Sequence, residues 1–479
     1  MSPRSFARTL GLLGLLLLLL WSCTLYVLWR LGTPPPLVVA PLFPSFEPSL
    51  PPPPEAPSRE TVIGAGFTRR DPNPPELPGS WPHFRGPGYD GISRESQRLA
   101  DSWPAAGPPE LWSVDLCHGF SGAAIHRGRA YILDYDSRTT QEMLRCLSMS
   151  DGREIWRRWH DLKLFNNHGY VHTTPAISER TLAVIGAKNH LMCVDPESGD
   201  LRWGLDLVRA FGEHFVNHFS VQTPLIDGST IVIASAGDSL LAGLDAETGK
   251  ILWKTPNERR WKPSYSSVIP ALIGGKRHYL YSADEGIVAV SAEEGSRGQL
   301  LWQVLAWPGS NTVPLPVVLD GGLIFLTTGY SRGSMLLGNA VRGGAPNILW
   351  QQDAREGFSS EAHTPLYADR HLFGVPPDSA GAIRGQLVCV NPHNGGKTIW
   401  ASGKDRRFGM YQPYLLADGK IFILGADEYL TMVRATSERY EELGRARILK
   451  NGDWHSWMAL AGGRLLIREN NRLACFDLR

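Results

Sequence analysis

The feature that most constrains the fold is a unit that recurs through most of the 479-residue chain. Its clearest copies, Asp195–Trp203 and Asp245–Trp253, end in an acidic turn with a Gly, followed by a Trp. Successive Trp residues are 44, 47, 50, 49, 48 and 50 positions apart. Repeats of this length bury their apolar faces against their neighbours, so the chain must form an array of similar units. The Trp residues concerned are Trp112, Trp156, Trp203, Trp253, Trp302, Trp350 and Trp400.

Each unit contains the pattern of about four short strands. Apolar and polar residues alternate along Ser229–Ile233, and Pro-led runs such as Thr174–Ile177 and Thr223–Ile226 begin the units. The Asp-x-x-x-Gly segments are typical of hairpin turns. The high counts of Gly (50) and Pro (36) fit many turns and disfavour a helical bundle. Four strands per unit at this spacing predict a β-propeller.

The last unit is incomplete, and this predicts how the ring closes. Residues Trp457–Arg479 supply three strands, and the isolated segment Leu111–Val114 supplies the missing fourth. Pairing the first and last segments removes exposed sheet edges. With blades ending at 156, 203, 253, 302, 350, 400 and near 449, residues 111–479 are predicted to form an all-β, eight-bladed propeller with four-stranded blades, closed by this N-terminal strand.

Four of the six Cys residues occupy the third strand of their units: Cys146, Cys193, Cys389 and Cys475. Equivalent positions in different blades should lie too far apart for a disulfide, which requires Cα atoms within about 7 Å. We therefore expect these Cys residues to be buried free thiols.

The N-terminus carries a membrane signal. Residues 10–29 contain no charged side chain, and a helix of this length spans the hydrocarbon core of a bilayer. Arg4 and Arg8 precede the stretch, which favours a cytoplasmic segment 1–9. The prediction is one transmembrane signal-anchor helix at 10–31. A cleaved signal peptide and a lipoprotein signal at Cys23 remain as alternatives.

The two segments between this helix and the ring differ in composition. Residues 32–78 are rich in Pro and are predicted to be a mostly disordered spacer with polyproline II character. Residues 79–110 are predicted to form a leader that packs on the propeller.

The loops that precede the first strand of each unit should converge at one mouth of the ring. They contain many His and aromatic residues, whose rings ligate metals, stack on planar groups or contact partner loops. Hydrogen bonding of each His to buried loop backbone is the structural alternative. The His-x-x-x-His pairs place both rings on one face only in a helix, so no metal site is assigned. The candidates for ligand or partner binding are His168, His172, His214, His218, Tyr265, Asn311, His363, Tyr411, Trp454, His455 and Trp457.

Nucleic-acid binding is the function class that charge disfavours. Lys and Arg (48) balance Asp and Glu (47), so the chain lacks the broad basic excess of nucleic-acid-binding proteins. The sequence also lacks a Walker loop, a G-x-S-x-G elbow and an H-E-x-x-H motif. Catalytic residues therefore remain unassigned.

The repeat endings and the segment Trp81–Ser93 together resemble the PQQ-like (quinoprotein-type) propeller repeat family. This resemblance covers residues 80–479 and implies that the seven repeated Trp residues pack against neighbouring blades. One branch of the family is the scaffold subunit of the outer-membrane β-barrel assembly machinery, and another is the PQQ-dependent dehydrogenases. The dehydrogenase branch implies PQQ with Ca²⁺, but this chain has no adjacent Cys pair and no stretch that aligns with that branch's Ca²⁺ and catalytic residues.

The resulting hypothesis is a membrane-anchored, extracytoplasmic scaffold or assembly factor without catalysis, because the regular ring carries no recognisable reaction centre. Its expected partners are the membrane and envelope proteins, and its expected location is the bacterial inner membrane, single-pass, with the propeller on the periplasmic side. The alternative is a PQQ-dependent oxidoreductase of the alcohol or sugar dehydrogenase type.

Overall fold

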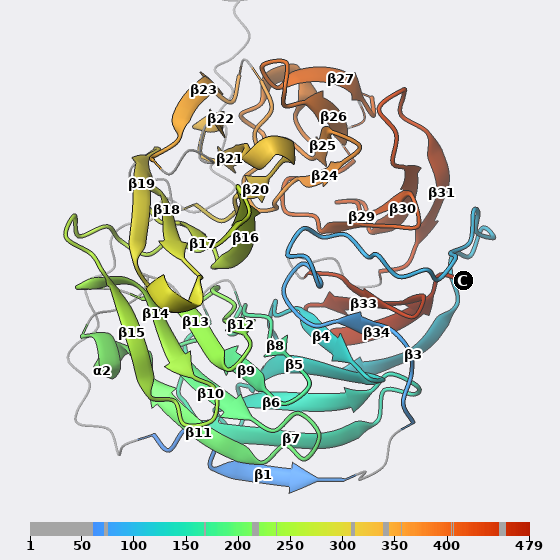
Figure 1. Ribbon diagram of the computed structural model, residues 1–479. Helices are drawn as coiled ribbons and strands as arrows, with labels where there is room; N and C mark the ends of the chain where they lie inside the picture. The colour runs from blue at the N-terminus through green and yellow to red at the C-terminus, as the bar shows by residue number, and fades with distance from the viewer. Residues whose placement is uncertain are drawn as a thin grey trace, which may run out of the picture. The chain divides into compact units, whose positions relative to one another are not determined.

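Eight antiparallel sheets follow one another around a common centre (Figure 1). This arrangement in a computed structural model confirms the predicted all-β, eight-bladed propeller. Residues 61–479 make up one unit, and residues 1–60 lie outside the described part of the chain. The described ranges are 61–70, 75–166, 169–212, 220–235, 237–307, 312–338, 344–355, 357–403, 405, 407–449 and 457–479.

The first four blades each contain four consecutive strands, numbered from the centre of the ring outward. Blade 1 comprises β4 (Ala123–His126), β5 (Arg129–Asp136), β6 (Gln141–Ser148) and β7 (Glu154–Asp161). Blade 2 comprises β8 (Ala176–Ile177), β9 (Leu182–Ile185), β10 (His190–Val194) and β11 (Leu201–Asp206). Blade 3 comprises β12 (Leu225–Asp227), β13 (Thr230–Ala234), β14 (Ser239–Asp245) and β15 (Ile251–Pro256). Blade 4 comprises β16 (Ile269–Ile273), β17 (Lys276–Ser282), β18 (Gly286–Ser291) and β19 (Leu300–Leu305).

The next three blades repeat this order. Blade 5 comprises β20 (Val317–Val318), β21 (Ile324–Thr328), β22 (Gly333–Gly338) and β23 (Asn347–Gln352). Blade 6 comprises β24 (Leu366–Ala368), β25 (His371–Gly374), β26 (Val388–Asn391) and β27 (Lys397–Ala401). Blade 7 comprises β28 (Tyr414–Ala417), β29 (Lys420–Leu424), β30 (Tyr429–Arg434) and β31 (Glu442–Arg447). Short helices occur in the connections: α2 (Leu207–Phe211), η1 (Glu294–Ser296), η2 (Asp320–Gly322) and η4 (Gly381–Ile383).

Blade 8 closes the ring with strands from both ends of the propeller. Its strands β32 (Ala459–Ala461), β33 (Arg464–Glu469) and β34 (Arg472–Asp477) come from the C-terminus. The fourth is β3 (Glu110–Asp115), which pairs antiparallel with β34 and places Trp112 opposite Cys475 (Figure 1). The predicted closure is therefore present, and it leaves β34 hydrogen-bonded on both edges.

Blade 1 differs from the four-stranded prediction, because two short upstream strands extend it to six. Strand β1 (Gly66–Arg69) pairs with the outer strand β7, and β2 (Ser80–Trp81) pairs with the inner strand β4. Strand β1 falls within the range 32–78 that we assigned to the spacer. Ordered structure thus begins before the predicted leader, while residues 32–60 lie outside the described part.

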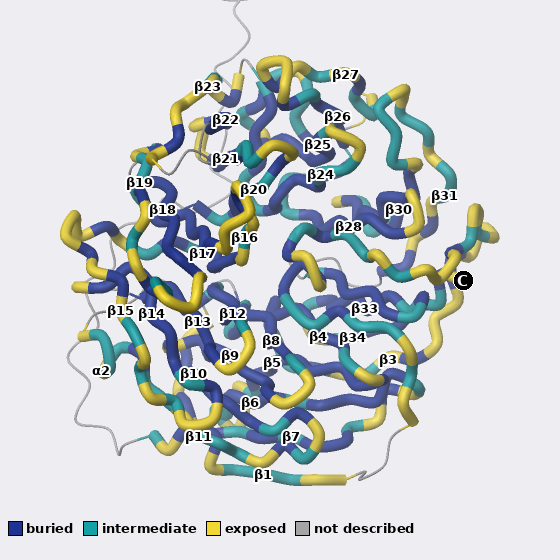
Figure 2. Tube along the Cα trace, viewed as in Figure 1, coloured by how far each residue is buried: buried dark blue, intermediate teal, exposed yellow. Residues whose placement is uncertain are grey.

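Buried residues, most of them apolar, make up most of the inner strands of the blades, and exposed residues lie in the turns and outer strands (Figure 2). Most of the repeated Trp residues pack between blades, over a Gly in the turn that precedes the outer strand of the next blade. Five such pairs occur among the described residues: Trp112 with Gly152, Trp156 with Gly199, Trp203 with Gly249, Trp253 with Gly298, and Trp350 with Gly396. A Cβ added at any of these Gly residues would lie 2.6 to 3.0 Å from the indole.

Several of these indoles also donate a hydrogen bond to the neighbouring blade. The acceptors are backbone carbonyls at 2.9 to 3.0 Å: Met149 for Trp112, Ala246 for Trp203, Pro392 for Trp350 and Thr436 for Trp400. Trp302 is buried in the shared core of blades 3 to 5. At these seams the repeated Trp residues contribute ring packing and, in four cases, one N–H donor.

The third-strand Cys residues lie directly opposite these Trp residues. Cys146, Cys193, Cys389 and Cys475 pair across strands with Trp156, Trp203, Trp400 and Trp112. All four are buried free thiols, as predicted, and Cys117 is a fifth free thiol. A small side chain at this position makes room for the neighbouring indole.

Within the described residues, none of the helices has the length and apolar character needed to cross a bilayer. The predicted transmembrane segment 10–31 and the segment 1–9 lie outside these residues.

Candidate functional site: the mouth of the ring

One face of the ring carries the loops that lead from each outer strand to the next inner strand, together with the turns between second and third strands. We call this the mouth face, and it is where the sequence placed its candidates. Six candidates lie outside the described residues: His168, His214, His218, Asn311, Trp454 and His455. The five that the structure describes are His172, Tyr265, His363, Tyr411 and Trp457.

Three of these five come together. The Nε2–H of His363 donates to the backbone carbonyl of Tyr411 across 2.9 Å. The His363 ring also meets the Trp457 ring edge to face, with centroids 4.3 Å apart. His363 is 2% exposed, so its ring fixes the position of the Tyr411 loop. Loops from blades 6, 7 and 8 are thereby joined at one point of the mouth.

His172 and Tyr265 lie elsewhere on this face. His172 precedes β8 of blade 2, and its ring lies 5.5 Å from the ring of Phe120. Tyr265 precedes β16 of blade 4. The described candidates therefore form one joined group and two separate positions.

Two residues outside the predicted set complete the joined group. The carboxylate of Glu361 accepts hydrogen bonds from the Tyr330 backbone N–H at 3.1 Å and from the Tyr411 hydroxyl at 3.4 Å. Tyr330 lies in the turn between β21 and β22. We call Tyr330, Glu361 and Tyr411 the tyrosine–glutamate cluster. Glu361 lies two residues before His363, so the sequence offered a signal for it, whereas Tyr330 belongs to a turn that no motif marked.

Burial governs the protonation of this cluster. It raises the pKa of Glu361, and the nearby Asp378 carboxylate raises it further, whereas the donors from Tyr330 and Tyr411 oppose both effects. Burial and the adjacent Glu361 also raise the pKa values of the Tyr330 and Tyr411 hydroxyls. Both hydroxyls therefore remain protonated at neutral pH.

The leader reaches the joined group from the other end of the ring. It runs along the inner edges of the blades: β2 pairs with β4, the Pro82 carbonyl accepts from Ile177 N–H, and Ile92 bridges to Leu416. The ring of Phe84 meets Trp457 edge to face at 4.3 Å between centroids. Leader and mouth loops thus share one aromatic layer.

Arg85 of the leader is fully enclosed in this layer. Its Nη2 donates to the backbone carbonyls of Asp90 at 2.7 Å and Pro365 at 3.4 Å. Burial lowers the pKa of Arg85 to about 10, which leaves the guanidinium charged at neutral pH. Arg85 therefore links the leader to the loop before β24.

A second buried polar group lies between blades 1 and 2. The Nε2 of His160 lies 3.1 Å from Nδ1 of His190 and 3.6 Å from Oε2 of Glu142. Oε1 of Glu142 accepts the Ala187 N–H at 2.7 Å. Burial raises the pKa of Glu142 to about 7 and lowers that of His160 to about 3, so a neutral acid lies beside a neutral imidazole between these two pH values.

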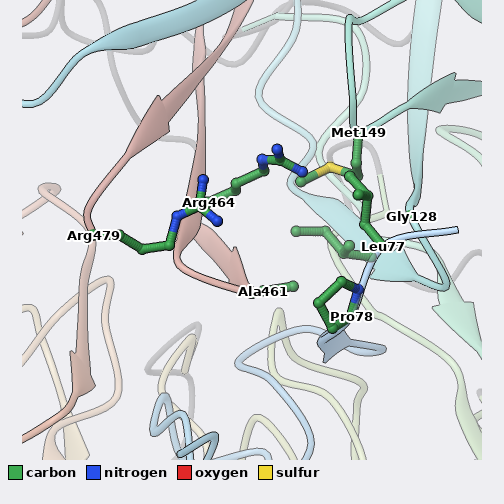
Figure 3. Close-up of a pocket in the computed structure, with 9 residues that line it drawn as sticks. Leu77, Pro78, Gly128, Met149, Ala461, Arg464 and Arg479 are labelled. Carbon is green, nitrogen blue, oxygen red and sulfur yellow. The ribbon is translucent and has the colours of Figure 1, made fainter. Parts of the chain in front are cut away.

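A small cavity of about 70 Å³ lies away from the mouth, where the leader crosses the seam between blades 8 and 1. Figure 3 shows Arg464 and Arg479 on one side of it, and Met149, Leu77 and Pro78 on the other. Its volume accommodates only a few water molecules.

The described residues at the mouth do not fit a stacked quinone with Ca²⁺. Phe84 and His363 both contact the Trp457 ring, so two leader and loop side chains already occupy its surroundings. Glu361 and Asp378 are the carboxylates of this group among the described residues, whereas Ca²⁺ requires six to eight oxygen ligands. Among the described residues, no group of three His, Cys, Asp or Glu side chains has the geometry to hold a metal ion.

Known proteins resemble this chain in sequence. The family model described as outer membrane protein assembly factor BamB matches residues 140–402, more than half of the chain. BamB of Bordetella pertussis is 27% identical over 195 residues, which cover 38% of this chain and 45% of that protein. BamB of Yersinia pestis is 27% identical over 193 residues, covering 39% and 44%. The chain thus spans less than half the length of the curated relatives it matches.

Solved structures show the same fold. BamB from Moraxella catarrhalis superposes with a TM-score of 0.53 at 14% identity, covering 77% of this chain and 99% of that one. The quinohemoprotein alcohol dehydrogenase ADHIIG from Pseudomonas putida HK5 superposes with a TM-score of 0.59 at 13% identity, covering 84% of this chain and 80% of that one. At these identities the likeness shows the propeller architecture alone. On the sequence match over residues 140–402, the chain belongs to the PQQ-like propeller family described as outer membrane protein assembly factor BamB.

Proposed function

We propose that this chain is a non-catalytic assembly factor of the bacterial envelope, which binds other envelope proteins through its propeller. The observation that carries the proposal is the leader inside the ring. Phe84 packs on Trp457 and Arg85 binds the Pro365 carbonyl, so the chain's own side chains occupy the axial layer below the mouth. With its own side chains on the axis, the propeller offers its outer faces and loops for contacts with other proteins. Membership in a family described as outer membrane protein assembly factor supports the same function.

The proposal includes a location. Residues 10–31 would hold the chain in the inner membrane as a single-pass anchor, with the propeller on the periplasmic side. The support is the uncharged stretch 10–29 preceded by Arg4 and Arg8. Fusion of alkaline phosphatase to the C-terminus tests it, because that enzyme folds only outside the cytoplasm. Active fusion in the membrane fraction is expected, and an inactive fusion contradicts the orientation.

The function is tested in the bacterium that produces the chain. Removing the gene should lower the amount of folded outer-membrane β-barrel protein, measured by heat-modifiable gel mobility, and the full-length chain should restore it. In parallel, the purified full-length chain is mixed with PQQ, Ca²⁺, a redox dye and alcohols or sugars. Saturable PQQ binding with dye reduction would replace the scaffold function by the oxidoreductase alternative. Unchanged β-barrel levels would also overturn the proposal.

A further inference from the structure

The tyrosine–glutamate cluster joins three consecutive blades at the mouth face. Tyr330 comes from blade 5, Glu361 from the loop that enters blade 6, and Tyr411 from the loop that enters blade 7. The His363 ring holds the Tyr411 loop from below through its bond to the Tyr411 carbonyl. The cluster is therefore a fixed part of the ring, although Tyr330 itself is 58% exposed.

The backbone around Tyr330 is built to present this side chain. Tyr330 and Ser331 both have positive φ, at 55° and 63°, which non-Gly residues seldom adopt. The preceding Gly329 is closely covered by Glu361, since a Cβ there would lie 2.0 Å from Glu361 Cγ. The positive φ angles of this turn place the exposed Tyr330 side chain beside the Glu361 carboxylate. Backbone strain of this kind is typical of binding sites.

Among the described residues, the Glu361 carboxylate of this cluster is held by neutral donors. Glu361 receives neutral donors, from Tyr330 N–H and the Tyr411 hydroxyl, and Asp378 lies close enough to act on it electrostatically. Among the described residues, the groups that act on the Glu361 carboxylate are Tyr330, Tyr411 and Asp378, and none of them is a cation. A half-buried carboxylate beside two Tyr side chains is electrostatically complementary to a cation, through direct pairing and through the aromatic faces.

We propose that the tyrosine–glutamate cluster binds an arginine side chain on a loop of a protein partner. Arginine fits better than lysine, because its planar guanidinium can pair with the Glu361 carboxylate and lie against a Tyr ring at the same time. The inference rests on the proposed scaffold function and gives that scaffold a contact point and a partner chemistry.

Fluorescein-labelled hexa-arginine provides the probe, titrated with the full-length chain in detergent and followed by fluorescence polarisation at low salt. Glu361→Gln should weaken binding about fivefold, the effect expected for a partly exposed charge pair. Tyr330→Ala should weaken it to a similar extent, and Tyr330→Phe should bind like the wild type because the ring is kept. Circular dichroism establishes that each variant is folded.

Glu285→Gln is the matched control. Glu285 lies in the turn of blade 4 between β17 and β18, which corresponds to the Tyr330 turn of blade 5, and its carboxylate accepts the Lys262 N–H at 2.7 Å. The substitution Glu285→Gln removes one carboxylate charge from the same face, so the dissociation constant of hexa-arginine should change less than about twofold. Equal weakening by both variants would overturn the proposal, because a diffuse acidic field would then explain binding. Equal affinity for hexalysine would overturn the arginine assignment.

The outcomes separate this inference from the proposed function. If Glu361→Gln leaves hexa-arginine affinity unchanged while gene removal still lowers the level of folded β-barrel protein, the arginine site is wrong and the scaffold function stands. If dye reduction with PQQ is observed, the scaffold function fails whatever the peptide result.

Discussion

The indole of Trp203 lies over Gly249 of the next blade, where an added Cβ would stand 2.7 Å from Trp203 Cδ2. The same indole donates its N–H to the Ala246 carbonyl at 3.0 Å. Gly249 also has a positive φ of 72°. One turn therefore serves blade 3 as a hairpin and blade 2 as a docking surface, which explains why the acidic-Gly turn and the Trp recur together.

Substituting this Gly tests the docking. Gly249→Ala should lower the free energy of unfolding by about 3 kcal/mol, about 1 from the positive φ and the rest from the clash with the indole. Gly228→Ala is the control, since Gly228 has φ 61° in the same blade and nothing lies within 4 Å of its Cβ position. Urea unfolding followed by Trp fluorescence measures both. Equal losses would mean that the indole does not restrict the position.

The indole N–H can be tested separately from the ring. Trp203→Phe should lower the free energy of unfolding by about 1 kcal/mol more than Trp253→Phe does, because only the substitution at Trp203 removes a hydrogen bond. Trp253 lies over Gly298 in the same manner, but its Nε1 has no acceptor among the described residues. The measurement is the difference between the two urea midpoints, and no difference would mean that ring packing alone holds the seam.

The buried Glu142 predicts a pH dependence of stability. Burial raises its pKa from 4.5 to about 7, so between these values the folded chain binds more protons at this site than the unfolded chain. Its contribution to stability is therefore complete below about pH 4.5 and is lost as the pH rises through about 7. Glu142→Gln removes this loss and keeps an oxygen for Ala187 N–H.

Urea unfolding of wild type and Glu142→Gln between pH 4.5 and 8 measures the effect. The variant should gain about 3 kcal/mol relative to wild type across this range. The lowered pKa of His160 acts in the opposite sense between about pH 3 and 6.5 in both proteins, so only their difference reports Glu142. A difference that stays constant with pH contradicts burial as the cause.

Ring closure depends on a buried ion pair as well as on β3. Nη2 of Arg468 on β33 lies 3.3 Å from Oδ1 of Asp134 on β5, and Nη1 donates to the Leu133 carbonyl at 2.9 Å. Arg468→Met should lower the free energy of unfolding by about 2 to 3 kcal/mol, because it removes the charged donors to Asp134 and the Leu133 carbonyl across the seam of blades 8 and 1, while Asp134 keeps its ion pair with Arg145. Arg439→Met, at an exposed pair with Glu441, should cost less than about 1 kcal/mol. Thermal unfolding measures both variants. Equal losses of stability in Arg468→Met and Arg439→Met would mean that the buried pair does not hold the seam.

The leader should contribute to stability through its aromatic contact. Phe84→Ala should lower the free energy of unfolding by about 3 to 4 kcal/mol, because it opens a cavity beside Trp457. Phe165→Ala, at a side chain that is 67% exposed, should change it by less than about 0.5 kcal/mol. If both variants unfold at the same urea concentration, the leader is not part of the cooperative core.

The sequence predicts which loops carry the candidate site residues, but it does not predict which of these residues contact one another. The loop position of His363, Tyr411 and Trp457 follows from the repeat register, because each precedes an inner strand. The roles of Tyr330 and Phe84 do not follow, since Tyr330 lies in a turn that no motif marks and Phe84 lies in the leader, outside the repeats. Tyr330 is set by a strained turn in blade 5, and Phe84 by a leader that enters the ring from the opposite end.

The sequence by itself determined the blade count and the position of the seam, because the number of repeats sets the number of blades and the incomplete last repeat needs one more strand. It also determined the free thiols, because equivalent positions in different blades lie too far apart for a disulfide. Tertiary structure alone decided that β1 extends blade 1, that Glu142 and His160 are buried together, and that the leader meets the mouth loops at Trp457. These contacts join residues 18 to 373 positions apart. Only the closed ring brings them within a few ångströms, because local pattern carries no information about such distances.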